Sequence, residues 1–309
     1  MTVPFSIEHD AELLQGVLER IGRDIGAGAG RHAVTMTAEL SQRFRSKAQG
    51  VTYVLDALER AFPGATFMVL DTAGRFQTPA EARSRPIEVA ASNWMATAMV
   101  VATEHPEVIL LDMGTTTTDI IPISAGQVQA LGRTDPDRLA SGELVYSGAL
   151  RTPVEALVRR VPWGDATAVV SADNFVHTAD VHCWLGTLPA GVFSDGTSGR
   201  ALNRDLAGER LARVVCADRS MVDDAGITAI ARHVAEEQVS GIAAAIRHVR
   251  SRHPRLDGAA VLGLGAPIAA AAAHQAGLKL VAMDSAWNAA TSRAAPAVAV
   301  ARLLENRGG

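Results

Sequence analysis

The chain has 309 residues, of which 48% are hydrophobic and 20% charged, so it can build a core and is neither disordered nor collagen-like. A formal net charge of −4 disfavours a protein that works mainly by gripping nucleic acid. Two cysteines cannot form a disulfide framework, and no signal peptide or apolar run of about 20 residues is present. We therefore expect a cytoplasmic protein with no membrane or nucleic-acid partner.

The first third of the chain predicts helices alternating with strands. Apolar residues at helical spacing predict the helices, and short β-rich runs predict the strands between them. The expected elements are a helix over Asp10–Ile25, a strand over His32–Thr37, a helix over Val51–Ala61, a strand over Thr66–Leu70 and a long helix over Ile87–Thr103. We place a domain boundary at that last helix, which gives domains of residues 1–103 and 104–309.

The middle of the chain predicts a β-rich region. Val108–Met113 is almost wholly apolar, as expected of a strand that is buried on both faces. Gly114 allows a tight turn, after which Thr117–Ile123 and Val128–Leu131 predict two further strands. Residues 132–161 are rich in turn formers and charge, and we expect an irregular layer there.

The last part of the chain returns to alternating strands and helices, which makes the fold class α/β with mostly parallel sheets and a β-hairpin. The expected strands are Ala166–Ser171, Gly258–Leu264 and Leu278–Met283, and the expected helices are Arg204–Cys216, Ala225–Arg252, Pro267–Gln275 and Pro296–Asn306.

The segment Asp112–Asp119 has the composition of a phosphate-binding loop. An acidic residue ends a buried strand, a glycine and four threonines follow, and a second acid opens the next strand. Backbone N–H groups and hydroxyls can donate to phosphate oxygens, and Asp112 or Asp119 can hold Mg²⁺ directly or through water. The alternative is a threonine-rich hairpin without a ligand. The loop residues are Gly114, Thr115, Thr116, Thr117 and Thr118.

This loop resembles that of the actin-like ATPase superfamily, and more closely that of its hydantoinase/oxoprolinase branch. The resemblance covers nearly the whole chain and is strongest with the proteins linked to tetrahydromethanopterin-dependent one-carbon metabolism. It rests on AVTMTAEL at Ala33–Leu40, QGVTYVLDAL at Gln49–Leu58, ASNWMATA at Ala91–Ala98, GRTDPDRLASGELVYSGALRTPV at Gly132–Val154 and RLARVVCAD at Arg210–Asp218.

The resemblance implies an actin-like (ribonuclease H-like) fold of two domains, with an insertion at residues 132–165. It also implies a transferase of methanofuran or methylofuran biosynthesis. Such an enzyme joins an aminomethylfuran diphosphate to tyramine or glutamyltyramine and releases diphosphate. The family's first phosphate loop, near the N-terminus, is not found in this sequence, so we expect an incomplete N-terminal sheet. ATP as a cofactor, an ATP-dependent hydrolase of the same family, a non-catalytic binding subunit and a homo-oligomer are alternatives that stay open.

Further candidate site residues lie in the long block that carries the resemblance. Arg133 and Arg151 suit a diphosphate because the planar guanidinium donates two parallel hydrogen bonds. Glu143 is a candidate base for the phenol or amine proton, and Tyr146 a substrate contact. The alternative is a solvated connection with local ion pairs.

Two other positions follow strands. Gly263 and Gly265 end an apolar strand and open a helix, whose N-terminus favours anions, although tight strand–helix packing explains the same pattern. Asp173 follows the Ala166–Ser171 strand, where ligand-facing residues often lie, but a turn cap is the alternative. We do not expect a metal site in the segment from His177 to Cys183, because adjacent residues on a strand point to opposite faces.

Overall fold

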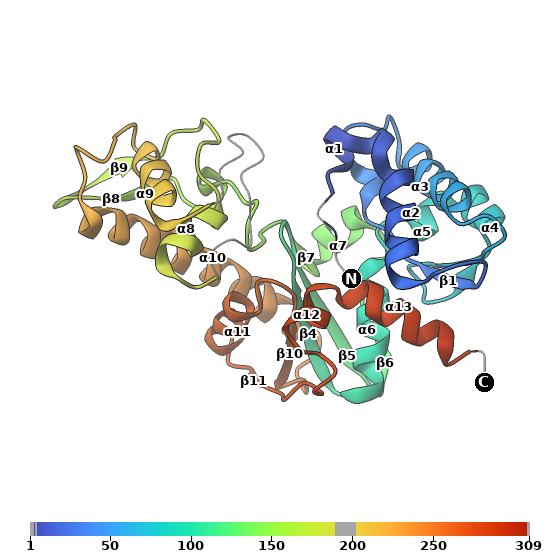
Figure 1. The fold of residues 1–309 in the computed structure, drawn as a ribbon. Coiled ribbons are helices and arrows are strands. Elements are labelled where there is room, and N and C mark those ends of the chain that lie inside the picture. The colour runs from blue at the N-terminus through green and yellow to red at the C-terminus, as the bar shows by residue number, and fades with distance from the viewer. Residues whose placement is uncertain (1–2, 4, 189–201, 308–309) are drawn as a thin grey trace. The chain divides into compact units, whose positions relative to one another are not determined.

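The computed structural model describes residues 3, 5–188 and 202–307, and its α/β fold separates into two compact units (Figure 1). The first unit contains Met1–Glu107, Ile123–Ala140 and Ala286–Gly309. The second contains Val108–Pro122 and Ser141–Ser285. The division into domains of residues 1–103 and 104–309 stays a prediction.

The first unit contains a three-stranded sheet in the order β1-β2-β3. β1 (Arg31–Val34) pairs in parallel with β2 (Thr66–Leu70), and β3 (Phe76–Gln77) returns antiparallel to β2. The parallel pair requires a crossover, which helix α3 (Lys47–Ala61) supplies. The N-cap Ser46 starts that helix by accepting a hydrogen bond from the Gln49 N–H.

Helices make up most of the rest of the first unit. Helix α2 ends at Gly26, which adopts the left-handed conformation that glycine favours. Helix α13 packs against α6 and β1. The helices are α1 (Ile7–Asp10), α2 (Leu14–Ile25), α4 (Pro79–Ser84), α5 (Pro86–Val89), α6 (Asn93–Glu104), α7 (Asp135–Ser141), α12 (Ala289–Arg293) and α13 (Ala295–Glu305), with 3₁₀ turns at Ala11–Leu13 and Ala38–Leu40.

The prediction of one helix over Ile87–Thr103 is wrong. The chain leaves α5 at Ala90 and enters the left-handed region at Ala91, where φ is +50°. The next residue, Ser92, is fully buried and its hydroxyl lies 3.0 Å from that of Thr35. A tertiary contact therefore interrupts a sequence whose alanines favour a continuous helix.

A six-stranded sheet follows the order β11-β10-β4-β5-β6, with β7 paired to β5. β4 and β10 run parallel, and Asp112 of β4 lies opposite Leu262 of β10. All six residues of β4 are buried, as its apolar sequence predicts. The strands are β4 (Val108–Met113), β5 (Thr118–Ser124), β6 (Gln127–Val128), β7 (Leu144–Val145), β10 (Gly258–Leu262) and β11 (Lys279–Leu280).

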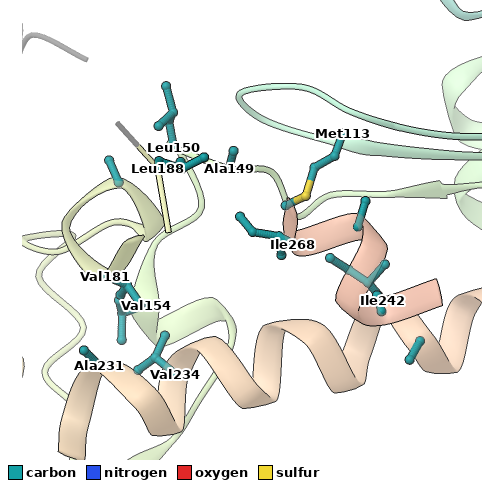
Figure 2. Close-up of a cluster of buried hydrophobic side chains, with 14 of the residues drawn as sticks. Met113, Ala149, Leu150, Val154, Val181, Leu188, Ala231, Val234, Ile242 and Ile268 are labelled. Carbon is teal, nitrogen blue, oxygen red and sulfur yellow. The ribbon is translucent and has the colours of Figure 1, made fainter. Parts of the chain in front are cut away.

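Helix α10 (Asp224–Ser251) is the long element on which the helices of the second unit pack (Figure 1). It contacts α8 (Thr178–Leu185), α9 (Arg204–Arg213), α11 (Ala266–Gln275) and strand β8 (Arg160–Trp163). Figure 2 shows apolar side chains gathered between α10 and its neighbours, including Ala231, Val234 and Ile242. The antiparallel hairpin of β8 (Arg160–Trp163) and β9 (Ala166–Val169) lies outside the main sheet.

Two expectations for the second half of the chain are corrected. Residues 132–161 are not wholly irregular, because they contain α7, β7, a 3₁₀ turn at Val154–Ala156 and the start of β8. His182 and Cys183 lie on helix α8 rather than on a strand. None of the helices in the described part of the chain combines the length and apolarity that a membrane span needs.

Candidate phosphate-binding site

The predicted loop connects β4 to β5 and begins from a buried anchor. Met113, the last residue of β4, is fully buried, and Figure 2 shows its side chain directed toward Ile268 of α11. The Gly114 N–H then donates to the Thr117 carbonyl oxygen at 2.9 Å, which closes the turn. Thr115 lies at the exposed tip, with its hydroxyl oxygen 3.3 Å from that of Thr116. Thr118 is buried and its hydroxyl donates to the Ser147 carbonyl oxygen at 2.6 Å.

The backbone of residues 149–151 donates hydrogen bonds to the carbonyl groups of this loop. The Ala149 N–H donates to the Gly114 carbonyl oxygen at 3.0 Å, and the N–H groups of Leu150 and Arg151 donate to the Thr115 carbonyl oxygen at 3.0 and 2.9 Å. Because a trans peptide places its C=O and N–H on opposite sides, these bonds turn the N–H groups of Thr115 and Thr116 away from that segment.

The N–H groups of Thr115 and Thr116 are available to a ligand. Neither donates a hydrogen bond to any group within residues 5–188 and 202–307. Successive backbone N–H groups of this kind form an anion-binding nest, and the adjacent threonine hydroxyls add further donors. The loop therefore has the donor arrangement that a phosphate group needs.

A buried polar network supports the segment behind the loop. The Gln238 side-chain amide on α10 donates to the Ser147 hydroxyl at 3.0 Å and to the Gly148 carbonyl oxygen at 2.9 Å. Because a carbonyl only accepts, this fixes the amide orientation, and the Gln238 Oε1 atom accepts from His182 Nε2 at 2.8 Å. Burial lowers the pKa of His182, so the ring is neutral with its proton on Nε2.

The close approach of the supporting segment to the loop depends on Gly148. A Cβ atom at Gly148 would lie 2.5 Å from the backbone N and C atoms of Thr116. The Thr178 hydroxyl also donates to the Gly148 carbonyl oxygen at 3.0 Å. Gly148 and Gln238 were not among the residues predicted from the sequence, and His182 was considered only as a metal ligand, because these residues meet only through tertiary packing.

The two predicted acidic residues lie close together beside this loop. Asp112 and Asp119 are 9% and 8% exposed. Burial, and secondarily the charge of Asp119, raises the pKa of Asp112 to about 7. The Asp112 side chain makes no hydrogen bond within the described part of the chain.

The turn between β10 and α11 fits against the end of β4 only because it contains glycine. At Gly263, where φ is +91°, a Cβ atom would lie 2.4 Å from the Met113 carbonyl oxygen and 2.7 Å from Asp112 Oδ1. At Gly265, a Cβ atom would lie 2.4 Å from Met113 Cγ, and the Gly265 N–H donates to the Met113 carbonyl oxygen at 2.9 Å. The N-terminus of α11 thus lies beside Asp112.

Other predicted residues occupy different environments. Glu143 is fully buried, with Oε1 3.7 Å from the Nη2 atom of Arg252. Tyr146 is 59% exposed, and Arg151 has an exposed side chain while its N–H binds the loop. Arg133 belongs to the first unit, where Nη1 donates to the Thr72 carbonyl oxygen at 3.0 Å.

The remaining candidate positions lie between β9 and α8 or on α8 itself. Asp173 is exposed in the connection between these elements. Asp180 lies 3.2 Å from Arg210 in an ion pair, and His182 belongs to the Gln238 network. Within residues 5–188 and 202–307, no group of three or more His, Cys, Asp and Glu side chains is arranged to hold a metal ion.

The Gly148→Ala substitution tests the support of the loop. Because the added Cβ would displace the Thr116 backbone, we expect the dissociation constant for pyrophosphate, measured by calorimetry in the presence of Mg²⁺, to rise by at least ~10-fold. Gly241→Ala in α10 is the matched control, since its Cβ would meet no atom within 4 Å. Unchanged pyrophosphate affinity in the Gly148→Ala variant would show that the loop does not depend on this contact.

The Asp112→Asn substitution tests the electrostatics of the acidic pair. Because the folded-state pKa of Asp112 is about 7, against 3.8 ordinarily, the native state keeps a proton that the unfolded chain releases between these values. Wild-type stability should therefore fall as pH rises through this window, and the Asp112→Asn variant should not show that loss. Urea unfolding of the metal-free protein from about pH 4.5 to 8 measures the difference.

The control for that experiment is Asp137→Asn. Hydrogen bonds from the Thr134 hydroxyl and N–H lower the pKa of Asp137, so its substitution should decrease stability at neutral pH, the opposite sign. If the difference in unfolding free energy between the Asp112→Asn variant and the wild type does not change with pH, the assignment of the raised pKa to Asp112 is contradicted.

Comparisons with known proteins agree with this architecture. The sequence model of the family described as hydantoinase/oxoprolinase matches residues 31–307. The chain is 35% identical over 277 residues to the (4-{4-[2-(gamma-L-glutamylamino)ethyl]phenoxymethyl}furan-2-yl)methanamine synthase of Methanocaldococcus jannaschii, covering 89% of this chain and 82% of that relative. It is 36% identical over 115 residues to the synthase of the same name from Methanococcus vannielii, covering 37% of this chain and 51% of that relative.

A solved structure shares the fold. Nucleotide-free acetone carboxylase, from work on the mechanism of ATP-dependent acetone carboxylation, superposes with a TM-score of 0.56 at 16% identity. The match covers 82% of this chain and 38% of the acetone carboxylase chain. The family-model match over residues 31–307 and the 35% identity to the M. jannaschii synthase show that the chain belongs to the hydantoinase/oxoprolinase family.

Proposed function

We propose that this protein is a transferase of methanofuran or methylofuran biosynthesis that forms an aryl ether and releases diphosphate. The similarity to the M. jannaschii synthase supports the reaction, since the compound in that enzyme's name contains a phenoxymethylfuran ether and a methanamine group. The observation that carries the proposal is the pair of unused N–H groups at Thr115 and Thr116, which suit a diphosphate leaving group.

The proposed reaction displaces diphosphate from a furan methylene carbon. The phenol oxygen of tyramine or glutamyltyramine forms a bond to that carbon, the carbon–oxygen bond to diphosphate breaks, and the phenolic proton passes to a base. The furan ring stabilises positive charge at the methylene carbon. Donors fixed before the reaction can then stabilise the negative charge that grows on the departing diphosphate.

We propose Mg²⁺ as the cofactor, held by Asp112 and Asp119. The residues fit this ion because Asp112 is a buried carboxyl without a hydrogen bond in the described chain, and because Asp119 lies close enough to raise the Asp112 pKa. Mg²⁺ is usually bound by one or two carboxylates together with substrate phosphates. When bound, it would neutralise charge on the leaving diphosphate. Two carboxylates alone make an incomplete site, so Mg²⁺ and diphosphate should bind together.

We propose roles in binding and proton transfer for the remaining candidate residues. Arg151 and Arg133 would neutralise the diphosphate, and Tyr146, Asp173, Gly263 and Gly265 would line the substrate or phosphate site. The exposed side chain of Arg151, next to an N–H that binds the loop, supports its role. Glu143 would accept the phenolic proton. The partners would be small-molecule substrates. The two free thiols, Cys183 and Cys216, suit a protein that works in a reducing cytoplasm.

We also propose that the fold is of the actin-like (ribonuclease H-like) type, with domains of residues 1–103 and 104–309 and an insertion at 132–165. The structural likeness to acetone carboxylase and the mixed α/β sheets support this arrangement. An incomplete N-terminal sheet is part of the same proposal, supported by the short sheet of β1, β2 and β3 in the described part of the first unit. ATP dependence and a non-catalytic role are outcomes that the experiments below distinguish, and a homo-oligomer stays a prediction.

Turnover of the purified protein tests the proposed function. With an aminomethylfuran diphosphate, glutamyltyramine and Mg²⁺, we expect one ether and one diphosphate per turnover, measured by mass spectrometry and a pyrophosphate assay. Asp119→Asn should lower kcat/KM at least ~100-fold, because charge stabilisation at the leaving group is lost. Asp165→Asn, in the turn between β8 and β9, is the control.

Two results would contradict this proposal. Product formation that consumes ATP would indicate the ATP-dependent alternative, and no turnover with any combination of substrates and nucleotide would indicate a binding subunit.

Glu143→Gln tests the proposed base separately. If Glu143 accepts the phenolic proton, turnover should fall ~100-fold or more, and an acceptor with a more acidic phenol should restore part of the rate. If Glu143 acts only through its buried ion pair with Arg252, the variant should lose stability but show no such dependence on phenol acidity.

A further inference from the structure

Glu39 in the first unit is a buried carboxyl group without a hydrogen-bond partner. It lies in the 3₁₀ turn Ala38–Leu40 and is 1% exposed. Neither carboxylate oxygen accepts a hydrogen bond of ordinary geometry within the described chain, although the N–H groups of Glu39 itself and of Ala91 face it. Burial raises the pKa of Glu39. Glutamate is rarely buried unless it is paired, so this environment needs an explanation.

The position of Glu39 is fixed by close backbone packing. A Cβ atom at Gly50 of α3 would lie 2.6 Å from the Cα and 2.8 Å from the carbonyl oxygen of Glu39, so only glycine allows this contact. The carboxylate lies near the N–H of Ala91, whose left-handed backbone is strained for a residue other than glycine. The backbone of Glu39 is thus fixed against α3, with its carboxyl group near Ala91.

The charges that face Glu39 leave a net negative site. Lys47 Nζ lies 2.8 Å from Asp135 Oδ2 in an ion pair, and each side chain is about one-fifth exposed, at 20% and 19%. Lys47 favours the ionised form of Glu39, and Asp135 opposes it. With Glu39 ionised, two negative charges face one positive charge, which Asp135 already engages. A cation is therefore the ligand that would compensate the buried carboxylate.

We propose that Glu39, beside the Lys47–Asp135 ion pair and the Ala91 backbone, binds the primary ammonium group of a small-molecule ligand. An ammonium has three donors and no acceptor, whereas an ionised carboxylate has only acceptors. The choice of candidate amines rests on the proposed function, in which the furan carries an aminomethyl group and the glutamyl group carries a second amine. The preference for a cation rests on Glu39 and its surroundings alone.

A matched pair of small probes tests this site without requiring turnover. Furfurylamine and furfuryl alcohol have nearly the same size, but only the amine is charged. Wild-type protein should bind furfurylamine at least ~10-fold more tightly than the alcohol, and Glu39→Gln should abolish that preference, as measured by calorimetry near pH 7. Glu59→Gln, an exposed position on α3, should keep it.

A parallel titration with γ-glutamyltyramine distinguishes the two amines. Glu39 dependence for this compound but not for furfurylamine would assign the site to the glutamyl amine, and still to an ammonium group. Equal affinity of the wild type for furfurylamine and the alcohol, together with γ-glutamyltyramine binding that Glu39→Gln leaves unchanged, would overturn the proposal.

Stability measurements separate this role from a structural one. Removing an unpaired buried charge should leave the unfolding free energy of Glu39→Gln unchanged or increased, whereas a structural carboxylate would leave it decreased. Lys47→Gln is the second variant: it makes the site more negative, so the amine preference should persist or increase, and its loss would contradict the proposal. If the amine preference holds while the transferase assay fails, the ammonium site stands and only the proposed reaction is wrong.

Discussion

The contact between the loop after β4 and the segment 148–151 is the constraint on which the candidate site depends. Three N–H groups of that segment take up the carbonyl oxygens of Gly114 and Thr115, and planar trans peptides then point the following N–H groups the other way. Gly148 allows this close approach because it has no side chain, and the buried Gln238 side chain donates a hydrogen bond to the Gly148 carbonyl oxygen. The anion-binding property of the loop is thus imposed by its neighbours rather than by its threonines.

The fold buries two carboxyl groups in positions where their ionisation would lower stability. Asp112 and Glu39 are both buried, and burial raises the pKa of each carboxyl group. A protein under no functional constraint would favour apolar residues at such positions, because an unpaired buried charge is destabilising. Each carboxyl lies beside glycine-dependent packing, at Gly263 and Gly50, which fixes the backbone around it. Ligands that compensate these charges, a divalent cation at one and an ammonium at the other, would return the lost stability.

The loop can be predicted from the sequence because its signal is local. The apolar run of β4, the glycine after it and the threonines before the second acid all lie within one short stretch, and the resemblance to known proteins extended along the chain. The local pattern did not predict helix α8, the break at Ala91 or the network of Gln238. Each of these depends on residues that are distant in sequence, so tertiary contacts override or complete the local pattern. Glu39 lay inside a motif used for the resemblance, but only its burial without a partner marks it.

Hydrogen exchange at the loop tests the central claim most directly. The account predicts that Mg²⁺ with pyrophosphate slows exchange of the Thr115 and Thr116 amides at least ~10-fold, since these N–H groups would then donate to phosphate oxygens. ATP in place of pyrophosphate should give no greater protection. Exchange at these two amides that is unchanged by Mg²⁺ and pyrophosphate, when ligand is in excess, would contradict the claim that this loop binds diphosphate.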